Sequence, residues 1–337
     1  MKFKNKLILF VAIASVNTTF LYAQKQKDRV KEMMENLSKD ELIKHLSVIA
    51  GDDMEGRKTG EAGQKKAANY LRNFYKNLNI DALPGTTDYF QAVPSEAMKR
   101  MFSPKLNDSE NVVAYIKGSE KPDEYLVISA HYDHVGIANG EIFNGADDNG
   151  TGTTALLEIA RMFKIAQKNG FGPKRSIVFL HCTGEEYGLH GSRYFANSKI
   201  IPLENIIANL NVDMIGRRDR KYDKNNQDYI YLVGSDKLST ELHDISEAMN
   251  KKYTKLNLDY TYNDDKHPEM IYYRSDHYNF AKFNIPVIFY YSGEHADYHK
   301  PTDTVDRINF DDMLKRLQLI FVTAWELTNR PERIKLK

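Results

Sequence analysis

The sequence is poor in cysteine, with a single residue of this type, Cys182, among 337. No disulfide bond can therefore form within the chain. Cys182 comes directly after Ile177–His181 in a predicted strand, and we interpret it as a buried core thiol and not as a catalytic nucleophile.

An excess of charge of either sign is also absent, because the formal net charge is +1. The first 23 residues contain Lys2, Lys4 and Lys6 and no acidic residue, so the remainder carries 44 basic and 46 acidic residues. This near-neutral balance gives no indication of a nucleic-acid or membrane partner. Hydrophobic residues make up 42% and aromatic residues 11% of the chain, which is ample for the core of one large α/β domain.

The apolar stretch near the N-terminus, Leu7–Val16, is too short to span a bilayer comfortably. It follows basic residues and precedes Leu21-Tyr22-Ala23, a pattern typical of a secretory signal peptide. We expect residues 1–23 to be removed and residues 24–337 to form one domain, exported to the periplasm or secreted, with no membrane partner after cleavage. An uncleaved anchor is the alternative.

Segments of helix and strand character alternate along the mature chain. Ser38 and Glu41 form a capping-box pattern that opens a helix through Ile49, and Glu61–Asn79 has apolar residues at helical spacing. Leu83–Asn107 is predicted to be irregular. The other predicted strands are Asn111–Lys117, Tyr125–Ser129, Ser176–Cys182, Ile206–Met214, Tyr229–Val233 and Pro286–Tyr291, and the other predicted helices are Thr151–Gln167, Tyr187–Asn197, Lys237–Lys252, Ser275–Phe283 and Phe310–Thr328. The first two of these strands are expected to be neighbours around a Gly-Ser-Glu-Lys-Pro turn, and the alternation predicts an α/β fold with a mostly parallel central sheet flanked by helices.

Side chains able to bind a metal follow the predicted strands, and the carboxyl ends of parallel strands meet at one edge of a sheet. Histidine nitrogens and carboxylate oxygens are the ligands that zinc takes when no thiolate is present. The two histidines His131 and His299, together with several carboxylates, could hold two ions with one carboxylate shared. Of the adjacent Glu185 and Glu186, one could bind metal while the other takes a proton from metal-bound water. The alternative is a polar loop with helix-capping aspartates.

The chain resembles the M28 zinc peptidases, which include bacterial aminopeptidases, over roughly residues 40–330. The motifs that carry the resemblance are Ala130-His131-Tyr132-Asp133, Gly145-Ala146-Asp147-Asp148, Gly184-Glu185-Glu186, Asn211-Val212-Asp213-Met214 and Asp297-Tyr298-His299. Met54-Glu55-Gly56-Arg57 and Ser275-Asp276-His277 are also similar. The resemblance implies the zinc-peptidase (phosphorylase/hydrolase-like) fold. The family often carries an inserted accessory domain before the His-x-Asp motif, and Leu83–Asp123 is too short for one.

The resemblance implies a two-zinc centre with five ligands. Asp148, the second aspartate of its pair, would bridge the two ions. His131 and Asp213 would complete one site, and Glu186 and His299 the other. The peptide bond after Asp148 is often cis in this family.

The resemblance also implies roles for residues beside the metal. Glu185 would be the general base, and Asp133 would orient His131. Tyr272 occupies a position where some members place a tyrosine near the reacting carbonyl of the substrate. His134 adjoins a motif, but we interpret it as a supporting or surface residue.

Three classes of function follow from these patterns. The first is a zinc-dependent exopeptidase acting on peptides, most simply an aminopeptidase, with a carboxypeptidase-type member left open. The second is glutaminyl cyclase, an acyltransferase on the same kind of fold that usually works with one zinc; the acidic pair Asp147-Asp148 matches the peptidases better. The third is a metal-poor binding or scaffold relative, against which the intact ligand set and Glu185 argue.

Overall fold

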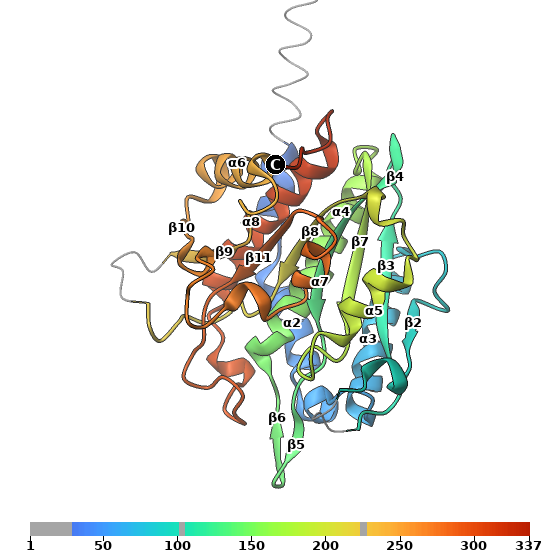
Figure 1. The fold of residues 1–337 in the computed structure, drawn as a ribbon, viewed down its shortest axis with the longest axis vertical. Helices are drawn as coiled ribbons and strands as arrows, with labels where there is room; N and C mark the ends of the chain where they lie inside the picture. Colours follow the sequence, from blue (N-terminus) through green and yellow to red (C-terminus); the bar gives the residue numbers. More distant parts are fainter. Residues whose placement is uncertain (1–28, 101–104, 223–227) are drawn as a thin grey trace, which may run out of the picture. The chain divides into compact units, whose positions relative to one another are not determined.

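A computed structural model describes residues 29–100, 105–222 and 228–337 (Figure 1). The predicted signal peptide, residues 1–23, lies outside the described residues. The chain divides into two compact units, Met1–Asn36 and Leu37–Lys337. In the first unit, residues 29–35 are helical, and every described strand belongs to the second. Among the described helices, none is both long enough and apolar enough to cross a membrane.

The second unit begins with two helices that the sequence predicts well. The helix α2 (Lys39–Ile49) is capped by Ser38, whose hydroxyl accepts the backbone N–H of Glu41 at 3.2 Å, so the predicted cap is confirmed. The helix α3 (Ala62–Asn77) buries one face, as its apolar spacing predicts.

A nine-stranded sheet forms the centre of the second unit (Figure 1). Its order is β1-β3-β7-β4-β8-β11-β9-β10, and β2 pairs with β3. The strands are β1 (Asp81–Ala82), β2 (Phe90–Val93), β3 (Ser109–Ile116), β4 (Lys121–His131), β7 (Arg175–Cys182), β8 (Ile206–Val212), β9 (Tyr229–Val233), β10 (Asn257–Asp259) and β11 (Val287–Tyr291). A separate hairpin consists of β5 (Gly136–Ala138) and β6 (Glu141–Phe143).

The expectation of a mostly parallel sheet holds for its middle and for the edge pair β9–β10. The strands β7, β4, β8 and β11 are parallel, whereas β3 pairs antiparallel with β7 and β9 pairs antiparallel with β11. The middle strands are buried along almost their whole apolar length, which is typical of parallel strands covered by helices on both faces. The sheet is therefore mixed, and the parallel part provides the edge at which strand ends converge.

The predicted pairing of Asn111–Lys117 with Tyr125–Ser129 is wrong, because β7 lies between β3 and β4. The connection between them passes the start of β7, where Ser119 N–H donates to Pro173 O at 3.1 Å and Gly118 N–H donates to Ser176 Oγ at 3.0 Å. Four extended residues reach about 13 Å, enough to cross two strand spacings of about 4.8 Å each. Because β7 is buried along its whole length, the backbone N–H and C=O groups on both of its edges need a neighbouring strand. A hairpin of β3 with β4 would leave one edge of β7 unpaired.

Several predicted boundaries are also corrected. The stretch Leu83–Asn107, expected to be irregular, contains β2 and a short 3₁₀ turn at Ser95–Met98. The helix α5 (His190–Ser198) starts three residues later than predicted, because Gly188 and Leu189 adopt positive φ angles of 123° and 57°. The predicted helix over Ser275–Phe283 is shorter, since only α7 (Tyr278–Ala281) is α-helical.

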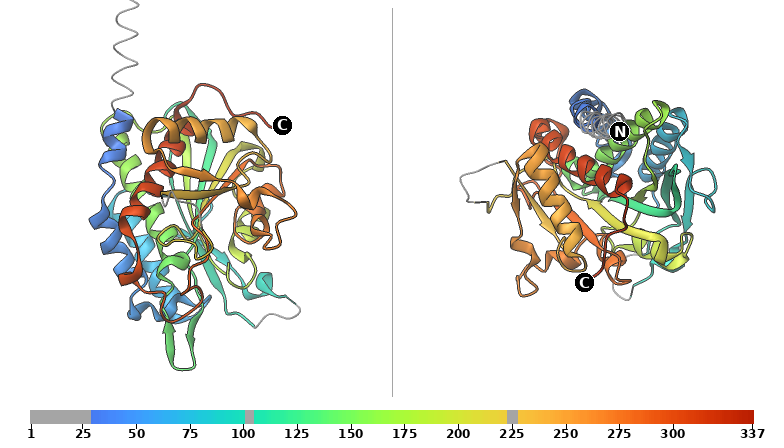
Figure 2. Two further views of the ribbon diagram at one scale, coloured as in Figure 1. Left: turned by 90° about the vertical axis from the view of Figure 1, so that its left-hand side faces the viewer. Right: turned by 90° about the horizontal axis from the view of Figure 1, so that it is seen from above.

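Helices cover both faces of the sheet (Figure 2). The remaining helices are α4 (Gly152–Lys168), α6 (Thr240–Met249) and α8 (Phe310–Asn329). On one face, α2, α3, α4 and α8 contact one another, and on the other face α5 contacts α7. The prediction of an α/β fold with a central sheet flanked by helices is confirmed.

Candidate metal centre and active site

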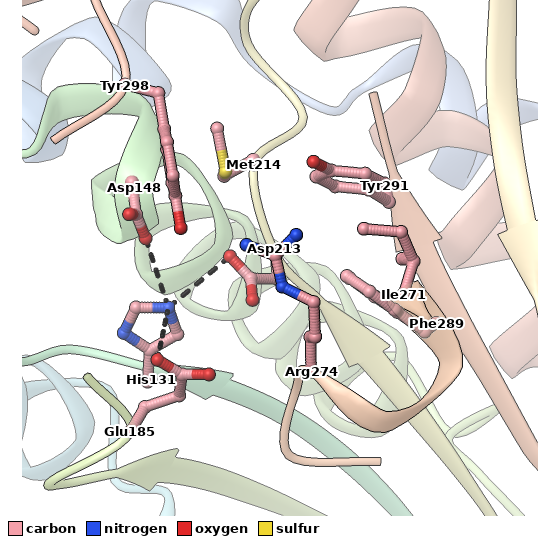
Figure 3. A pocket seen from close by; sticks show the side chains of 10 residues that line it. All are labelled: His131, Asp148, Glu185, Asp213, Met214, Ile271, Arg274, Phe289, Tyr291 and Tyr298. Carbon is pink, nitrogen blue, oxygen red and sulfur yellow. Dashed lines mark ion pairs between the residues drawn. The ribbon is translucent and has the colours of Figure 1, made fainter. Parts of the chain in front are cut away.

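The polar residues at the strand ends converge at the carboxyl edge of β4, β7 and β8. His131 is the last residue of β4, Asp213 follows the last residue of β8, and Glu185 comes three residues after β7 ends. Asp148 arrives from the turn that precedes α4. These four side chains line one pocket (Figure 3).

The first group of candidate ligands surrounds His131, which is buried. Its Nε2 lies 3.3 Å from Asp148 Oδ1, 3.3 Å from Asp213 Oδ1 and 3.9 Å from Glu185 Oε2. Figure 3 shows the three carboxylates converging on this nitrogen. Burial alone lowers the pKa of His131, but the charges of Asp213 and Glu185 outweigh that effect and raise the pKa well above its usual value.

The second group surrounds the other oxygen of Asp148. His299 Nε2 lies 2.9 Å from Asp148 Oδ2 and 3.1 Å from Glu186 Oε2. His134 Nδ1 lies 2.7 Å from Glu186 Oε1. Asp148 therefore presents one oxygen to each group, which is the geometry that a carboxylate shared by two ions requires.

The donor chemistry of these two groups fits zinc. Potential ligand atoms of His131, Glu185 and Asp213 lie within 4.8 Å of one another, and the same holds for His134, Asp148, Glu186 and His299 among the described residues. All are imidazole nitrogens or carboxylate oxygens. Burial raises the pKa of Glu185 well above its usual value, and repulsion from Glu186 and Asp213 adds to this effect against the opposing charge of His131. A cation bound between the carboxylates would remove that repulsion.

Asp147, the first aspartate of the acidic pair, turns away from the candidate ligands. Its Oδ1 accepts the backbone N–H of Gly216 at 2.7 Å and the hydroxyl of Thr151 at 3.0 Å. The structure therefore places the second aspartate at the centre and the first in a supporting position. The peptide bond between Asp148 and Asn149 is cis, as the resemblance implies.

Asp133 contacts both His131 and Glu185. His131 Nδ1 is 3.2 Å from the main-chain oxygen of Asp133, closer than the 3.8 Å that separates it from the carboxylate. The carboxylate instead accepts the hydroxyl of Thr59 at 2.7 Å and the backbone N–H of Glu185 at 3.2 Å. Asp133 can thus orient the imidazole through its backbone while its side chain holds the start of the Glu185 segment.

The sequence does not predict the roles of Asp303 and Ser275, which support two of the candidate ligands. The buried carboxylate of Asp303 accepts the backbone N–H groups of Asp147 and Asp148 at 3.0 and 3.1 Å, and so ties Asp148 to the loop that carries His299. Ser275 Oγ donates to Asp213 Oδ2 at 2.7 Å. Ser275 belongs to one of the motifs and Asp303 follows His299 by four positions, but only the fold brings them to a ligand.

Tyr272, which the resemblance places near the substrate, does not line the pocket around the candidate ligands and packs against the cluster that contains Ile271 and Phe289. Its ring packs against His277 at a centroid distance of 5.5 Å, Lys237 Nζ lies 4.8 Å from the ring, and Tyr272 is absent from the residues that line the pocket. Arg274 and Tyr298 do line the pocket, and the Tyr298 ring stacks on His299 at 4.0 Å. The 3₁₀ turn at Ile271–Tyr273 directs Tyr272 into an apolar cluster instead.

Part of the remaining pocket wall is apolar. Met214, Ile271, Phe289 and Tyr291 line it opposite the carboxylates (Figure 3). A polar reacting centre beside such a wall is the usual form of a site that recognises one side chain of a substrate.

Comparisons with known proteins agree with this arrangement. A probable leucine aminopeptidase of Arthroderma otae is 26% identical over 306 residues, which cover 88% of this chain and 76% of that protein. A probable glutamate carboxypeptidase of Arabidopsis thaliana is 36% identical over 110 residues, which cover 32% of this chain and only 15% of that protein.

Solved structures of bacterial aminopeptidases share the fold. The LapA aminopeptidase of Legionella pneumophila has a TM-score of 0.68 at 22% identity and covers 91% of this chain and 76% of its own. The BSAP zinc aminopeptidase of Bacillus subtilis has a TM-score of 0.67 at 17% identity and covers 88% of this chain and 96% of its own. The model of peptidase family M28 matches residues 111–324, a range that includes every candidate metal ligand, and the chain therefore belongs to this family.

Proposed function

We propose that the protein is a two-zinc aminopeptidase that removes the N-terminal residue of peptides. The observation that carries the proposal is the position of Asp148, which directs one carboxylate oxygen to His131 and the other to His299. His131 and Asp213 would hold one ion, Glu186 and His299 the other, and Asp148 both. Bound zinc would polarise the scissile carbonyl and make water a stronger nucleophile at neutral pH.

The protein's own contribution to the chemistry centres on Glu185. Its carboxylate accepts a proton from the attacking water as the new carbon–oxygen bond forms. The same proton passes to the leaving nitrogen as the carbon–nitrogen bond breaks, which restores the carboxylate and releases an amino acid and a shortened peptide. Asp133 fixes the backbone of Glu185 for this transfer through the hydrogen bond at 3.2 Å.

The residues that line the pocket support a substrate with a free α-amine and an apolar N-terminal side chain. A carboxylate-rich centre favours a protonated α-amine, and the wall of Met214, Phe289 and Tyr291 favours an apolar N-terminal side chain. The name of the leucine aminopeptidase relative supports the same choice.

A screen of blocked and free amines tests the proposal. Zinc-loaded protein should release leucine from Leu-Ala-Ala and leave the N-acetylated peptide almost intact, with chelator-treated protein as the control. Equal cleavage of both peptides would contradict an aminopeptidase. Release of the C-terminal residue from the acetylated peptide would support the carboxypeptidase alternative that the glutamate carboxypeptidase relatives raise. Cyclisation of an N-terminal glutamine without hydrolysis would support glutaminyl cyclase.

A further inference from the structure

An open groove of about 550 Å³ runs beside the candidate metal centre and is distinct from the apolar pocket. It is lined by Glu185, Glu186 and His299, and also by Gly188, Leu189 and Arg100. The pocket and the groove share Glu185, Arg274 and Tyr298. If the N-terminal side chain occupies the pocket, the adjoining groove offers a path for the rest of the peptide.

Arg100 lines this groove, and two further cations, Arg193 and Lys282, are hydrogen-bonded to the segments next to it. Arg100 donates to the carbonyl of Gly188 at 2.7 Å, and Arg193 of α5 donates to the carbonyl of Ala97 at 3.0 Å. Lys282, which follows α7, donates to Asn279 Oδ1 at 3.0 Å. Asn279 in turn donates to the carbonyl of Leu189 at 3.1 Å, so the lysine and Arg100 attach to neighbouring residues of one turn.

These cations are not neutralised within the described part of the chain. The partners of Arg100, Arg193 and Lys282 are carbonyl oxygens, an imidazole nitrogen and an amide oxygen, and none of the three forms an ion pair with a described carboxylate. By contrast, Arg274 in the same groove pairs with Glu294 at 3.1 Å. Burial and then the charges of Arg193 and Arg100 lower the pKa of Lys282, which shows that the three charges act on one another.

We propose that Arg100, Arg193 and Lys282 form an anion subsite that binds a carboxylate of the substrate on the leaving-group side of the scissile bond. The proposal rests on the proposed function, because it assumes that a peptide passes through the groove. The carboxylate is either the free C-terminus of a short peptide or an acidic side chain just after the scissile bond. Both carry the same charge and the same acceptor oxygens for a guanidinium.

A set of three peptides distinguishes these sources: Leu-Ala-Ala, its C-terminal amide, and Leu-Asp-Ala amide. We expect kcat/KM for at least one carboxylate-bearing peptide to exceed that of the neutral amide by roughly fivefold at low salt, the upper range for one exposed ion pair. The difference should lie mainly in KM and shrink as salt is raised. Preference for the free C-terminus alone identifies one source, and preference for the aspartyl peptide alone identifies the other.

Variants of Arg100 test whether the preference for carboxylate-bearing peptides depends on the subsite. Arg100→Gln should bring the ratio between charged and neutral peptides close to one, and Arg100→Lys should keep most of it. Lys168→Gln is the matched control, because this exposed lysine ends α4, a 17-residue helix that starts at the site, and so lies about 25 Å away.

Two results would overturn the subsite. One is an equal rate of leucine release from all three peptides by the wild-type protein, which leaves the proposed function intact. The other is an unchanged ratio in Arg100→Gln. If the zinc-loaded wild-type protein releases leucine from none of the peptides, the proposed function fails, and the subsite fails with it.

Discussion

Glu185 and Glu186 are adjacent in the chain but face different partners. Glu185 Oε2 is 3.9 Å from His131, whereas Glu186 is held by His134 at 2.7 Å and lies 3.1 Å from His299. The turn after β7 separates the two side chains, so one can carry a proton while the other binds metal. Substitution of each residue tests this division.

Glu185→Gln keeps the shape of the side chain and removes the base, so kcat should fall by about 10²–10⁴ while both zinc ions remain bound. Glu186→Ala removes a ligand and should lower the zinc content as well as kcat. Steady-state kinetics and elemental analysis of both variants measure these effects. Loss of zinc in Glu185→Gln with retention in Glu186→Ala would reverse the two roles.

A buried histidine away from the metal centre gives a pH dependence of stability. Burial lowers the pKa of His181 to about 3, from a usual value of 6.5, and its Nε2 lies 2.7 Å from the hydroxyl of Tyr75. The unfolded chain therefore binds this proton before the folded chain does. The free energy of unfolding that comes from keeping His181 neutral in the folded protein is fully present above pH 6.5. It is lost as the pH falls toward 3.

His181→Gln removes this proton uptake while keeping a polar group near Tyr75. Between pH 7 and pH 5, the free energy of unfolding of the wild-type protein should fall by about 2 kcal/mol more than that of the variant. Urea unfolding of both chelated proteins at the two pH values measures the difference. Parallel acid sensitivity in the two proteins would show that His181 takes no part.

At the scale of elements, one arginine fastens three segments to the active-site edge. The buried guanidinium of Arg57 donates to the carbonyls of Ile49 in α2, Tyr132 after β4, and Asn144 and Gly145 before the acidic pair, at 2.7–2.9 Å. Burial lowers the pKa of Arg57 to about 10, so the side chain stays charged at neutral pH. The Met-Glu-Gly-Arg motif thus has a structural role.

Arg57→Lys keeps the charge but cannot reach carbonyls that lie in different directions, because an ammonium is a point donor and a guanidinium is a planar fork. We expect the unfolding free energy to fall by about 3 kcal/mol, since buried acceptors lose their donors. Arg72→Lys, at an exposed ion pair with Asp88, should change it by about 0.5 kcal/mol or less. Similar urea midpoints for the two variants would contradict this role.

Local sequence patterns predict where helices and strands lie better than they predict which strands pair. Ser38 and Glu41 specify the start of α2 through contacts within one turn, so the cap follows from the sequence. The insertion of β7 between β3 and β4 depends on residues about 60 positions apart along the chain, which no local pattern records. The same limit applies to the site. The motifs supplied His131, Asp148 and Glu186, but the contacts of Asp303 and Ser275 with the ligands exist only once the strands are assembled.

At the scale of the whole molecule, we propose that the chain is exported and loses its N-terminal segment. The basic and then apolar start of the sequence predicts that the mature protein begins near Gln24. Mass spectrometry of the N-terminus of protein recovered from an exporting host measures this directly. A mature chain that still contains Leu7–Val16 would contradict cleavage.

We propose that Asp148 bridges two zinc ions. Anomalous diffraction at the zinc edge, from crystals of protein purified without chelator, tests it most directly. We expect two peaks, one among His131, Asp213 and Asp148 and the other among Glu186, His299 and Asp148. A single peak, or peaks that leave Asp148 outside their coordination, would contradict it.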